Sequence, residues 1–227
     1  MSKIRLVVFD MAGTTVNENN LVYKTLLEAI NNEGFAFSLE DVLLHGAGKE
    51  KRQAIIDVLG STIHNSDHIS IADRAFANFK TALESAYDEA EITSFPGMNE
   101  FFSQLRKDGI IIVLNTGYDS KTANKLLTQL RWKKGEDYDA LITSDDVKNG
   151  RPHPDMILKA MELFGITNPA EVLKAGDSEI DILEGKNAKC GLNVGVLSGA
   201  QTREQLQIAN PDYILEDVTK LQEIIWD

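Results

Sequence analysis

Four polar motifs of this 227-residue chain have the residue types needed to bind a metal ion and to hydrogen-bond to an anion. Each comes directly after an apolar run, and together they are Asp10-Met11-Ala12-Gly13-Thr14, Asn115-Thr116-Gly117-Tyr118, Ser144-Asp145-Asp146 with Arg151 downstream, and Gly176-Asp177-Ser178 with Asp181. In an open parallel sheet, ligands bind beyond the carboxyl ends of the strands, which share one edge. We therefore expect these motifs to converge on one site.

The acidic residues of these motifs favour a magnesium site. Asp10, Asp177 and Asp181 would form an all-oxygen cluster, which suits Mg²⁺ better than zinc. Each also has an ordinary structural explanation, because an aspartate after a strand often caps a loop and an acid in the first turn of a helix is common. Their occurrence in order, at successive strand ends, favours a shared site.

The remaining polar groups could bind phosphoryl oxygens. The Thr116 hydroxyl and the backbone N–H groups of Gly13, Thr14 and Gly117 are candidate hydrogen-bond donors. A metal ion and such donors around a carboxylate nucleophile neutralise the charge on the transferring oxygens, as phosphoryl transfer requires. Thr116-Gly117 alone could equally be an ordinary turn. The combined pattern predicts phosphoryl-transfer chemistry.

The elements that would position these motifs alternate between strand and helix. Apolar runs predict strands at 4–9, 110–114, 140–143, 171–175, 192–197 and 213–215, and helical patterns cover 98–107, 120–130, 154–164 and 179–188. Strands that alternate with helices form a parallel sheet covered on both faces. The sequence therefore predicts a doubly wound α/β core.

A helical segment interrupts this core after the first strand. Residues 17–94 contain no convincing strand and carry helical patterns at 21–32, after the capping box Ser38-x-x-Asp41, from Lys49 to Gly60, and from a cap at Ser66 or Asp67 along the stripe Ala72, Phe76, Phe79, Leu83 and Tyr87. We therefore expect two domains, a core of residues 1–16 and 95–227 and an inserted helical cap of residues 17–94.

Composition excludes several classes of partner. The formal net charge is −12, which leaves no surplus of Lys and Arg to neutralise nucleic-acid phosphates. No apolar span approaches the roughly 20 residues of a membrane helix, and no leader of signal-peptide type is present. The single cysteine, Cys190, cannot form an intrachain disulfide and suits a reducing compartment. We expect a cytoplasmic protein that acts on a small molecule.

The motifs resemble the four motifs of the haloacid dehalogenase (HAD) superfamily. The resemblance covers the whole chain, with 17–94 corresponding to the cap. It implies that Asp10 is the nucleophile that becomes an aspartyl phosphate and that Thr116 and Arg151 hold the phosphoryl oxygens. It also implies Mg²⁺ bound by Asp10, the backbone carbonyl of Ala12 and Asp177, with assistance from Asp181. The oligomeric state stays open between a monomer and a homodimer.

Two departures are similar to phosphonoacetaldehyde hydrolase (phosphonatase) and its relatives. Ala12 stands where most phosphatases of the superfamily have an aspartate that acts as general acid and base, and Arg151 replaces the usual lysine. Phosphate-ester hydrolysis usually needs an acid for the leaving oxygen. Cleavage of a carbon–phosphorus bond instead leaves a carbanion, which an iminium ion can absorb.

The resemblance implies an imine-forming lysine in the cap, and Lys49 after Gly46-Ala47-Gly48 stands at the expected position. Phosphonatase has a histidine three residues after its lysine, whereas this chain has Arg52, which could bind an anion. The implied substrate is therefore a 2-oxoalkyl phosphonate rather than phosphonoacetaldehyde specifically. Two alternatives remain open: a phosphatase of a small phosphate monoester, with Lys49 as an anion-binding residue, and a non-catalytic protein that binds a phosphorylated metabolite.

Overall fold

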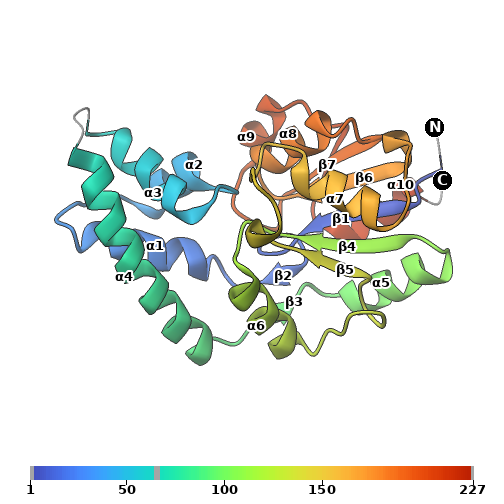
Figure 1. Cartoon of the computed structure of the whole chain (residues 1–227), viewed down its shortest axis with the longest axis horizontal. Helices are drawn as coiled ribbons and strands as arrows, with labels where there is room; N and C mark the ends of the chain where they lie inside the picture. Colours follow the sequence, from blue (N-terminus) through green and yellow to red (C-terminus); the bar gives the residue numbers. More distant parts are fainter. Residues whose placement is uncertain (1–2, 64–66, 226–227) are drawn as a thin grey trace.

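The computed structural model describes residues 3–63 and 67–225, and its main body is a parallel six-stranded sheet with helices on both faces (Figure 1). The sheet has the order β5-β4-β1-β6-β7-β8. Its strands are β1 (Leu6–Asp10), β4 (Ile111–Asn115), β5 (Ala140–Ile142), β6 (Val172–Gly176), β7 (Leu192–Val196) and β8 (Tyr213–Leu215). The helices of this body are α5 (Met98–Lys107), α6 (Ser120–Leu130), α7 (Asp155–Leu163), α8 (Glu179–Asn187), α9 (Arg203–Ile208) and α10 (Gln222–Ile225), with short 3₁₀ helices at Ser144–Asp146, Pro169–Glu171 and Val218–Leu221.

The central strand β1 is buried on both faces. Leu6 and Val8 belong to the apolar cluster that includes α7, whereas Val7 and Phe9 belong to the cluster that includes α5. This alternation follows from the two-residue period of a strand. The predicted doubly wound α/β core is confirmed. The sequence analysis did not predict the short helices α9 and α10.

The order of the strands creates the crevice for the site. The chain runs from β1 to β4 and β5 on one side and then crosses to β6 on the other side of β1. Asp10 is in register with Asn115 of β4, and Phe9 is in register with Ala175 of β6. The polar residues at these three strand ends therefore lie at the point where the strand order reverses, which is where open α/β sheets bind ligands.

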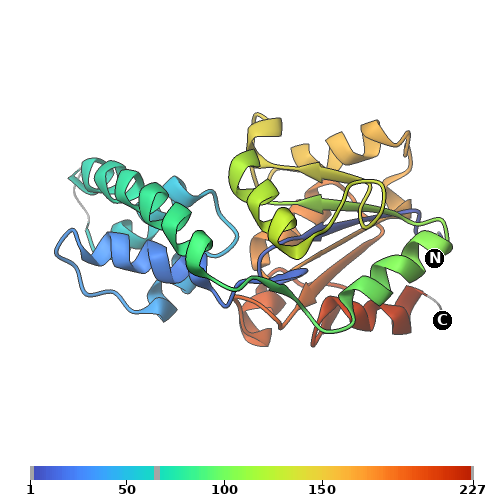
Figure 2. The same ribbon diagram turned by 90° about the horizontal axis from the view of Figure 1, so that it is seen from below.

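Four helices form a separate helical lobe beyond this edge of the sheet (Figures 1 and 2). They are α1 (Leu21–Asn31), α2 (Leu39–Gly46), α3 (Lys51–Gly60) and α4 (Asp67–Glu89). Along α4, Ala72, Phe79 and Leu83 are buried in the interior of the lobe, as the predicted stripe requires. Ser66, one of the two predicted caps of α4, lies outside the described residues.

The lobe joins the core through a two-stranded antiparallel ribbon. β2 (Val16–Asn17) pairs with β3 (Thr93–Ser94), and the pairs are Val16 with Ser94 and Asn17 with Thr93. The expectation of no strand within 17–94 is therefore corrected, because two-residue strands are too short to show an alternating pattern. Among the described residues, no helix is long and apolar enough to cross a membrane.

Candidate active site

A small cavity lies between the carboxyl edge of the sheet and the helical lobe. Its volume is about 20 Å³, and it is lined by Asp10, Ala12, Tyr23, Gly48, Lys51, Thr116, Gly117, Tyr118, Arg151 and Asp177. A cavity of this size holds about one water molecule. The lobe therefore lies close over the strand ends, and a phosphoryl group, which is larger than a water molecule, needs more space there than this arrangement provides.

The predicted carboxylates come together at this cavity. Asp10, Asp177 and Asp181 are buried, and one oxygen atom from each lies within 4.8 Å of the others. Burial raises the pKa of Asp177 well above its ordinary value, and the negative charges of Asp10 and Asp181 raise it further. Burial also raises the pKa of Asp10, although Arg151 opposes this. Hard oxygen ligands with uncompensated negative charge fit a divalent cation such as Mg²⁺.

Asp181 differs from the other two carboxylates because both of its oxygens are engaged. Oδ1 lies 3.0 Å from Arg151 Nη1 and 2.9 Å from Lys174 Nζ, and Oδ2 accepts a 2.5 Å hydrogen bond from the Ser178 hydroxyl. Burial raises the pKa of Asp181, but the two cations outweigh it and lower the pKa overall. Asp181 therefore orients the cations of the site, and Asp10 and Asp177 face the cavity.

Arg151 reaches the predicted nucleophile directly. Its Nη1 donates to Asp10 Oδ1 at 2.6 Å, and its Nη2 donates to the backbone oxygen and the side-chain oxygen of Asn115 at 3.0 and 2.8 Å. Its Nε donates to Glu184 Oε2 at 3.1 Å. The Arg151 side chain is 3% exposed. Together with the contact to Asp181, these hydrogen bonds to Asp10, Asn115 and Glu184 fix the guanidinium plane beside Asp10.

The sequence analysis missed a buried lysine that supports this network. Lys174 lies in the middle of β6 with no exposure, and its Nζ contacts Asp181 Oδ1 at 2.9 Å, Asn115 Oδ1 at 2.7 Å and Glu184 Oε2 at 3.3 Å. A lysine inside a predicted strand that is buried on both faces was the available signal, because such a charge needs a partner. Its carboxylate partners are Asp181 and Glu184 on α8, and Glu184 gave no signal of its own.

Of the four residues predicted to donate hydrogen bonds to phosphoryl oxygens, two line the cavity and two use their N–H groups elsewhere. Thr116 and Gly117 line the cavity. The N–H groups of Gly13 and Thr14, however, donate to Val16 O at 2.9 Å and to Met11 O at 3.1 Å within the turn that follows β1. The expectation that these two N–H groups bind phosphoryl oxygens is therefore corrected. Gly13 instead allows close packing, because a Cβ there would lie 2.3 Å from Asp177 Oδ2.

Lys49 does not line the cavity, and the basic side chain that the helical lobe contributes to it is Lys51. Lys49 pairs with Asp57 along α3 and is about a third exposed. Arg52 pairs with Asp73 of α4 at 2.7 Å, and its side chain is 41% exposed. The expected positions of Lys49 and Arg52 in the site are therefore corrected. The reason is that α3 begins at Lys51 with Glu50 as its N-cap, rather than at Lys49.

Lys51 has an unusual environment for a lysine. It is 9% exposed, and its Nζ lies 4.9 Å from the centre of the Tyr23 ring and 5.5 Å from that of Tyr118. Its hydrogen bond goes to the backbone oxygen of Lys49 at 3.0 Å. No carboxylate of the described residues is within ion-pair distance of this Nζ. Burial lowers the pKa of Lys51, although the charge of Asp10 opposes the shift.

The sequence contained a signal for Lys51. It precedes Ala54 by three residues and Ile55 by four, so it shares the buried face of α3 with them. Lys49 precedes α3, so the helical spacing of buried residues does not predict the direction of its side chain.

Gly48, a glycine of the helical lobe, allows the lobe to pack closely against the core. Gly48 has a φ of 73°, and a Cβ there would lie 2.2 Å from Ile180 Cγ2 and 2.3 Å from Ser178 Oγ. Its N–H donates to the Tyr23 hydroxyl at 2.9 Å. A larger residue would hold the lobe away from the strand ends, because Gly48 packs directly on the loop that carries Asp177.

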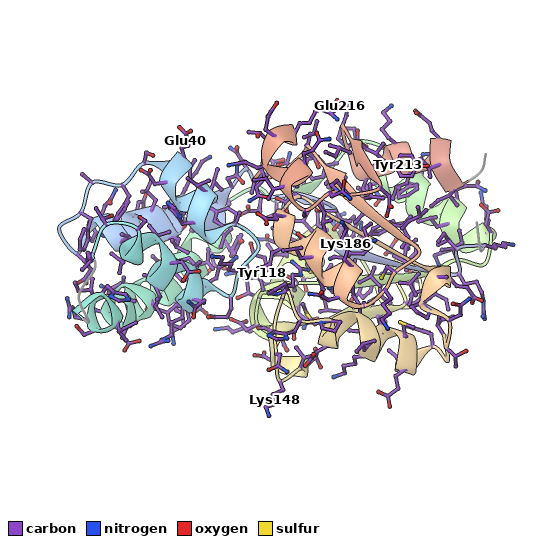
Figure 3. The ribbon with its side chains drawn as sticks, turned by 90° about the horizontal axis from the view of Figure 1, so that it is seen from above. Glu40, Tyr118, Lys148, Lys186, Tyr213 and Glu216 are labelled. Atoms are coloured by element: carbon purple, nitrogen blue, oxygen red, sulfur yellow. The ribbon has the colours of Figure 1, made fainter. Side chains whose placement is uncertain are left out.

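Tyr118 connects the core to both ends of the lobe. It lies at the junction of lobe and sheet (Figure 3), and its hydroxyl is 3.0 Å from that of Tyr87 at the end of α4. The Tyr87 hydroxyl in turn donates to Glu18 Oε2 at 3.3 Å, just after β2. This buried chain of hydrogen bonds fixes the aromatic ring that contacts Lys51.

Comparisons with known proteins agree with this geometry. The family model of haloacid dehalogenase-like hydrolases matches residues 7–194. Pyrophosphatase PpaX of Bacillus mycoides is 26% identical over 98% of this chain and 97% of its own length. A phosphonoacetaldehyde hydrolase-like protein of Oleispira antarctica has a TM-score of 0.85 at 23% identity, covering 100% of this chain and 92% of its own. A predicted phosphoglycolate phosphatase of Haemophilus somnus has a TM-score of 0.79 at 20% identity, covering 99% of each chain.

Proposed function

The chain belongs to the haloacid dehalogenase-like hydrolases, and from this premise we propose that it cleaves the carbon–phosphorus bond of a 2-oxoalkyl phosphonate. Membership makes the protein an enzyme, so the non-catalytic alternative is set aside. The observation that carries the proposal is Lys51, a buried lysine with a lowered pKa that lines the same cavity as Asp10. Ala12, where an acid would serve ester hydrolysis, supports it.

In the proposed reaction, Lys51 and Asp10 act on neighbouring atoms of the substrate. The Lys51 amine attacks the carbonyl carbon, and loss of water gives a protonated imine. An Asp10 oxygen bonds to phosphorus as the carbon–phosphorus bond breaks, and the electron pair of that bond passes into the iminium to give an enamine. Protonation of the enamine carbon and hydrolysis release the carbonyl product and the amine. Water then hydrolyses the aspartyl phosphate to phosphate and the Asp10 carboxylate.

The core residues hold the phosphoryl group during this sequence. Asp10, Asp177 and the backbone carbonyl of Ala12 would hold Mg²⁺, which when bound neutralises charge on the phosphoryl oxygens. Thr116 would bind one of the remaining oxygens, and Arg151 would bind another by exchanging its hydrogen bond to Asp10 for one to the phosphoryl group. Closure of the lobe over Lys51 excludes bulk water from the iminium.

The relatives favour a second candidate, a phosphatase of a small phosphate monoester or pyrophosphate. PpaX is named a pyrophosphatase, and the Haemophilus somnus protein a predicted phosphoglycolate phosphatase. In this candidate Asp10 and Arg151 keep their roles. Lys51 would protonate the leaving oxygen, which its lowered pKa allows.

Trapping the imine separates the two candidates. The protein is incubated with Mg²⁺, 2-oxopropyl phosphonate and borohydride, and its intact mass is measured for wild type, Lys51→Arg and Lys49→Arg. We expect a reduced adduct on wild type and on Lys49→Arg but none on Lys51→Arg. Lys49→Arg is the matched control because it changes a lysine two residues away that pairs with Asp57. Phosphate release from simple esters with no adduct on wild type would reject carbon–phosphorus cleavage in favour of the phosphatase.

A further inference from the structure

A second and larger cavity opens between the helical lobe and the core. Its volume is about 360 Å³, and it lies between α4 on one side and the loop Gly117–Asp119 with the first turns of α6 on the other. The lobe wall includes three apolar side chains, Phe76, Phe79 and Leu83. This volume is within the range of small-molecule sites.

The two cavities meet at the reactive lysine. Lys51, Gly117 and Tyr118 line both, whereas Asp10, Arg151 and Asp177 line only the smaller one. The Lys51 amine therefore lies at the boundary between a space that faces the phosphoryl site and a space that faces α4. A carbonyl carbon bonded to Lys51 Nζ carries two substituents, the phosphonomethyl group and one other. With the first directed to Asp10, the second is directed to the larger cavity.

The charges around the larger cavity balance. Its lining residues include four lysines and four carboxylates: Lys51, Lys80, Lys121, Lys125, Glu50, Glu84, Asp119 and Asp145. Lys121 pairs with Glu84 at 2.5 Å, and Lys125 pairs with Asp88 at 2.7 Å. A substituent with a full charge gains little from such a lining, whereas an apolar one gains contact with the phenylalanine wall.

We infer that the larger cavity holds the second substituent of the carbonyl carbon, and that the preferred substrate is a ketone with a neutral alkyl or aryl group. This inference rests on the proposed carbon–phosphorus cleavage and names its substrate class. An aldehyde such as phosphonoacetaldehyde has only hydrogen at this position and leaves the cavity empty. An alkyl chain of several carbons fills part of it and removes apolar surface from water.

The test compares two ketones of equal intrinsic reactivity, 2-oxopropyl and 2-oxohexyl phosphonate. We expect kcat/KM for the longer ketone to exceed that for the shorter by at least about tenfold, since even one buried methylene is worth roughly that much. Leu83→Trp narrows the cavity from the lobe side, and Thr122→Trp narrows it from the core side. Either variant should lower the ratio of the two kcat/KM values toward one. Leu44→Trp, at a site 53% exposed on α2, should leave the ratio unchanged.

The outcomes separate this inference from the proposed function. Equal kcat/KM values for the two ketones, or a preference that both cavity variants retain, would overturn the cavity assignment while carbon–phosphorus cleavage stands. If neither ketone nor phosphonoacetaldehyde releases phosphate or yields a borohydride adduct, both the cleavage and the cavity assignment are overturned. Two cavity variants from opposite walls keep the result decisive if one of them fails to fold.

Discussion

The core and the helical lobe differ in how they surround the buried cations near the small cavity. On the core side, Arg151 and Lys174 are almost fully buried, and each contacts carboxylates within about 3 Å. On the lobe side, Lys51 is nearly as buried but lies against two aromatic rings and a backbone oxygen. The core therefore holds its cations in place by pairing, whereas the cation that the described part of the lobe presents to the small cavity, Lys51, has no carboxylate within ion-pair distance.

This difference indicates a division of labour. Paired, multiply bonded charges keep fixed positions and protonation states, which suits the binding of a phosphoryl group. A buried amine without a counter-ion loses its proton more readily, which suits a nucleophile or a proton donor. Because the two walls belong to different parts of the chain, substitutions can test each wall separately.

The largest expected effect comes from the core. Asp10→Asn removes the proposed nucleophile while it keeps the side-chain shape, so we expect the rate of phosphate release to fall by about 10⁴-fold or more. Steady-state phosphate assays with an excess of Mg²⁺ measure this change. A variant with a substantial fraction of wild-type activity would show that Asp10 is not the phosphoryl acceptor.

The next effect concerns stability and contrasts two buried lysines. Lys174→Met leaves Asp181 and Glu184 short of a cation, and we expect it to lower the free energy of unfolding by about 3 kcal/mol or more. Lys51→Met removes a buried charge that has no carboxylate partner, so we expect a change within about 1 kcal/mol. Urea titrations of both variants give these values. Equal losses of unfolding free energy in the two variants would show that the core lysine and the lobe lysine do not differ in their need for a carboxylate partner.

The pH dependence of Lys51 provides a sharper measure of the lobe wall. Burial disfavours the charged amine and outweighs the attraction of Asp10, Glu18 and Asp177, so we expect its pKa below the ordinary 10.5. The neutral amine then accumulates at lower pH than in a solvated lysine. ¹⁵N NMR titration of the lysine side chains, with Lys51→Arg to assign the signal, measures this midpoint. A midpoint at or above 10.5 would contradict the desolvated environment.

The smallest effect is expected at the ion pair that bridges lobe and core on the outside. Lys121 is 76% exposed and Glu84 is 56% exposed, so water screens their attraction. Lys121→Ala should therefore leave the urea midpoint unchanged, in contrast to Lys174→Met. Glu84→Gln serves as the partner control. A clear loss of stability in either variant would show that this pair contributes to docking of the lobe.

The strand ends were predictable from the sequence because topology brings them together. Once an alternating pattern of strands and helices predicts a parallel sheet, the positions of Asp10, Thr116 and Asp177 follow, and the structure brings these residues to one cavity. Strands of two residues carry no such pattern, so the ribbon of β2 and β3 was missed.

The choice between Lys49 and Lys51 depends on local backbone geometry. The φ of 73° at Gly48 and the N-cap at Glu50 decide where α3 begins and which lysine turns toward the core. In the same way, the N–H groups of Gly13 and Thr14 are used within their own turn. Spacing to Ala54 and Ile55 favours Lys51 once the start of α3 is known, and the backbone conformation at Gly48 and Glu50 decides that start.

The ribbon of β2 and β3 has a consequence for how this protein could evolve. Because Val16 and Ser94 are paired neighbours, the two chain ends that support the lobe leave the core at the same place. Insertions whose ends are adjacent are well tolerated by a folded host. The lobe can therefore be exchanged as one cassette for another that carries a different residue in place of Lys51. Under the proposed function, such an exchange would change which leaving group departs while the core residues around Asp10 are inherited intact.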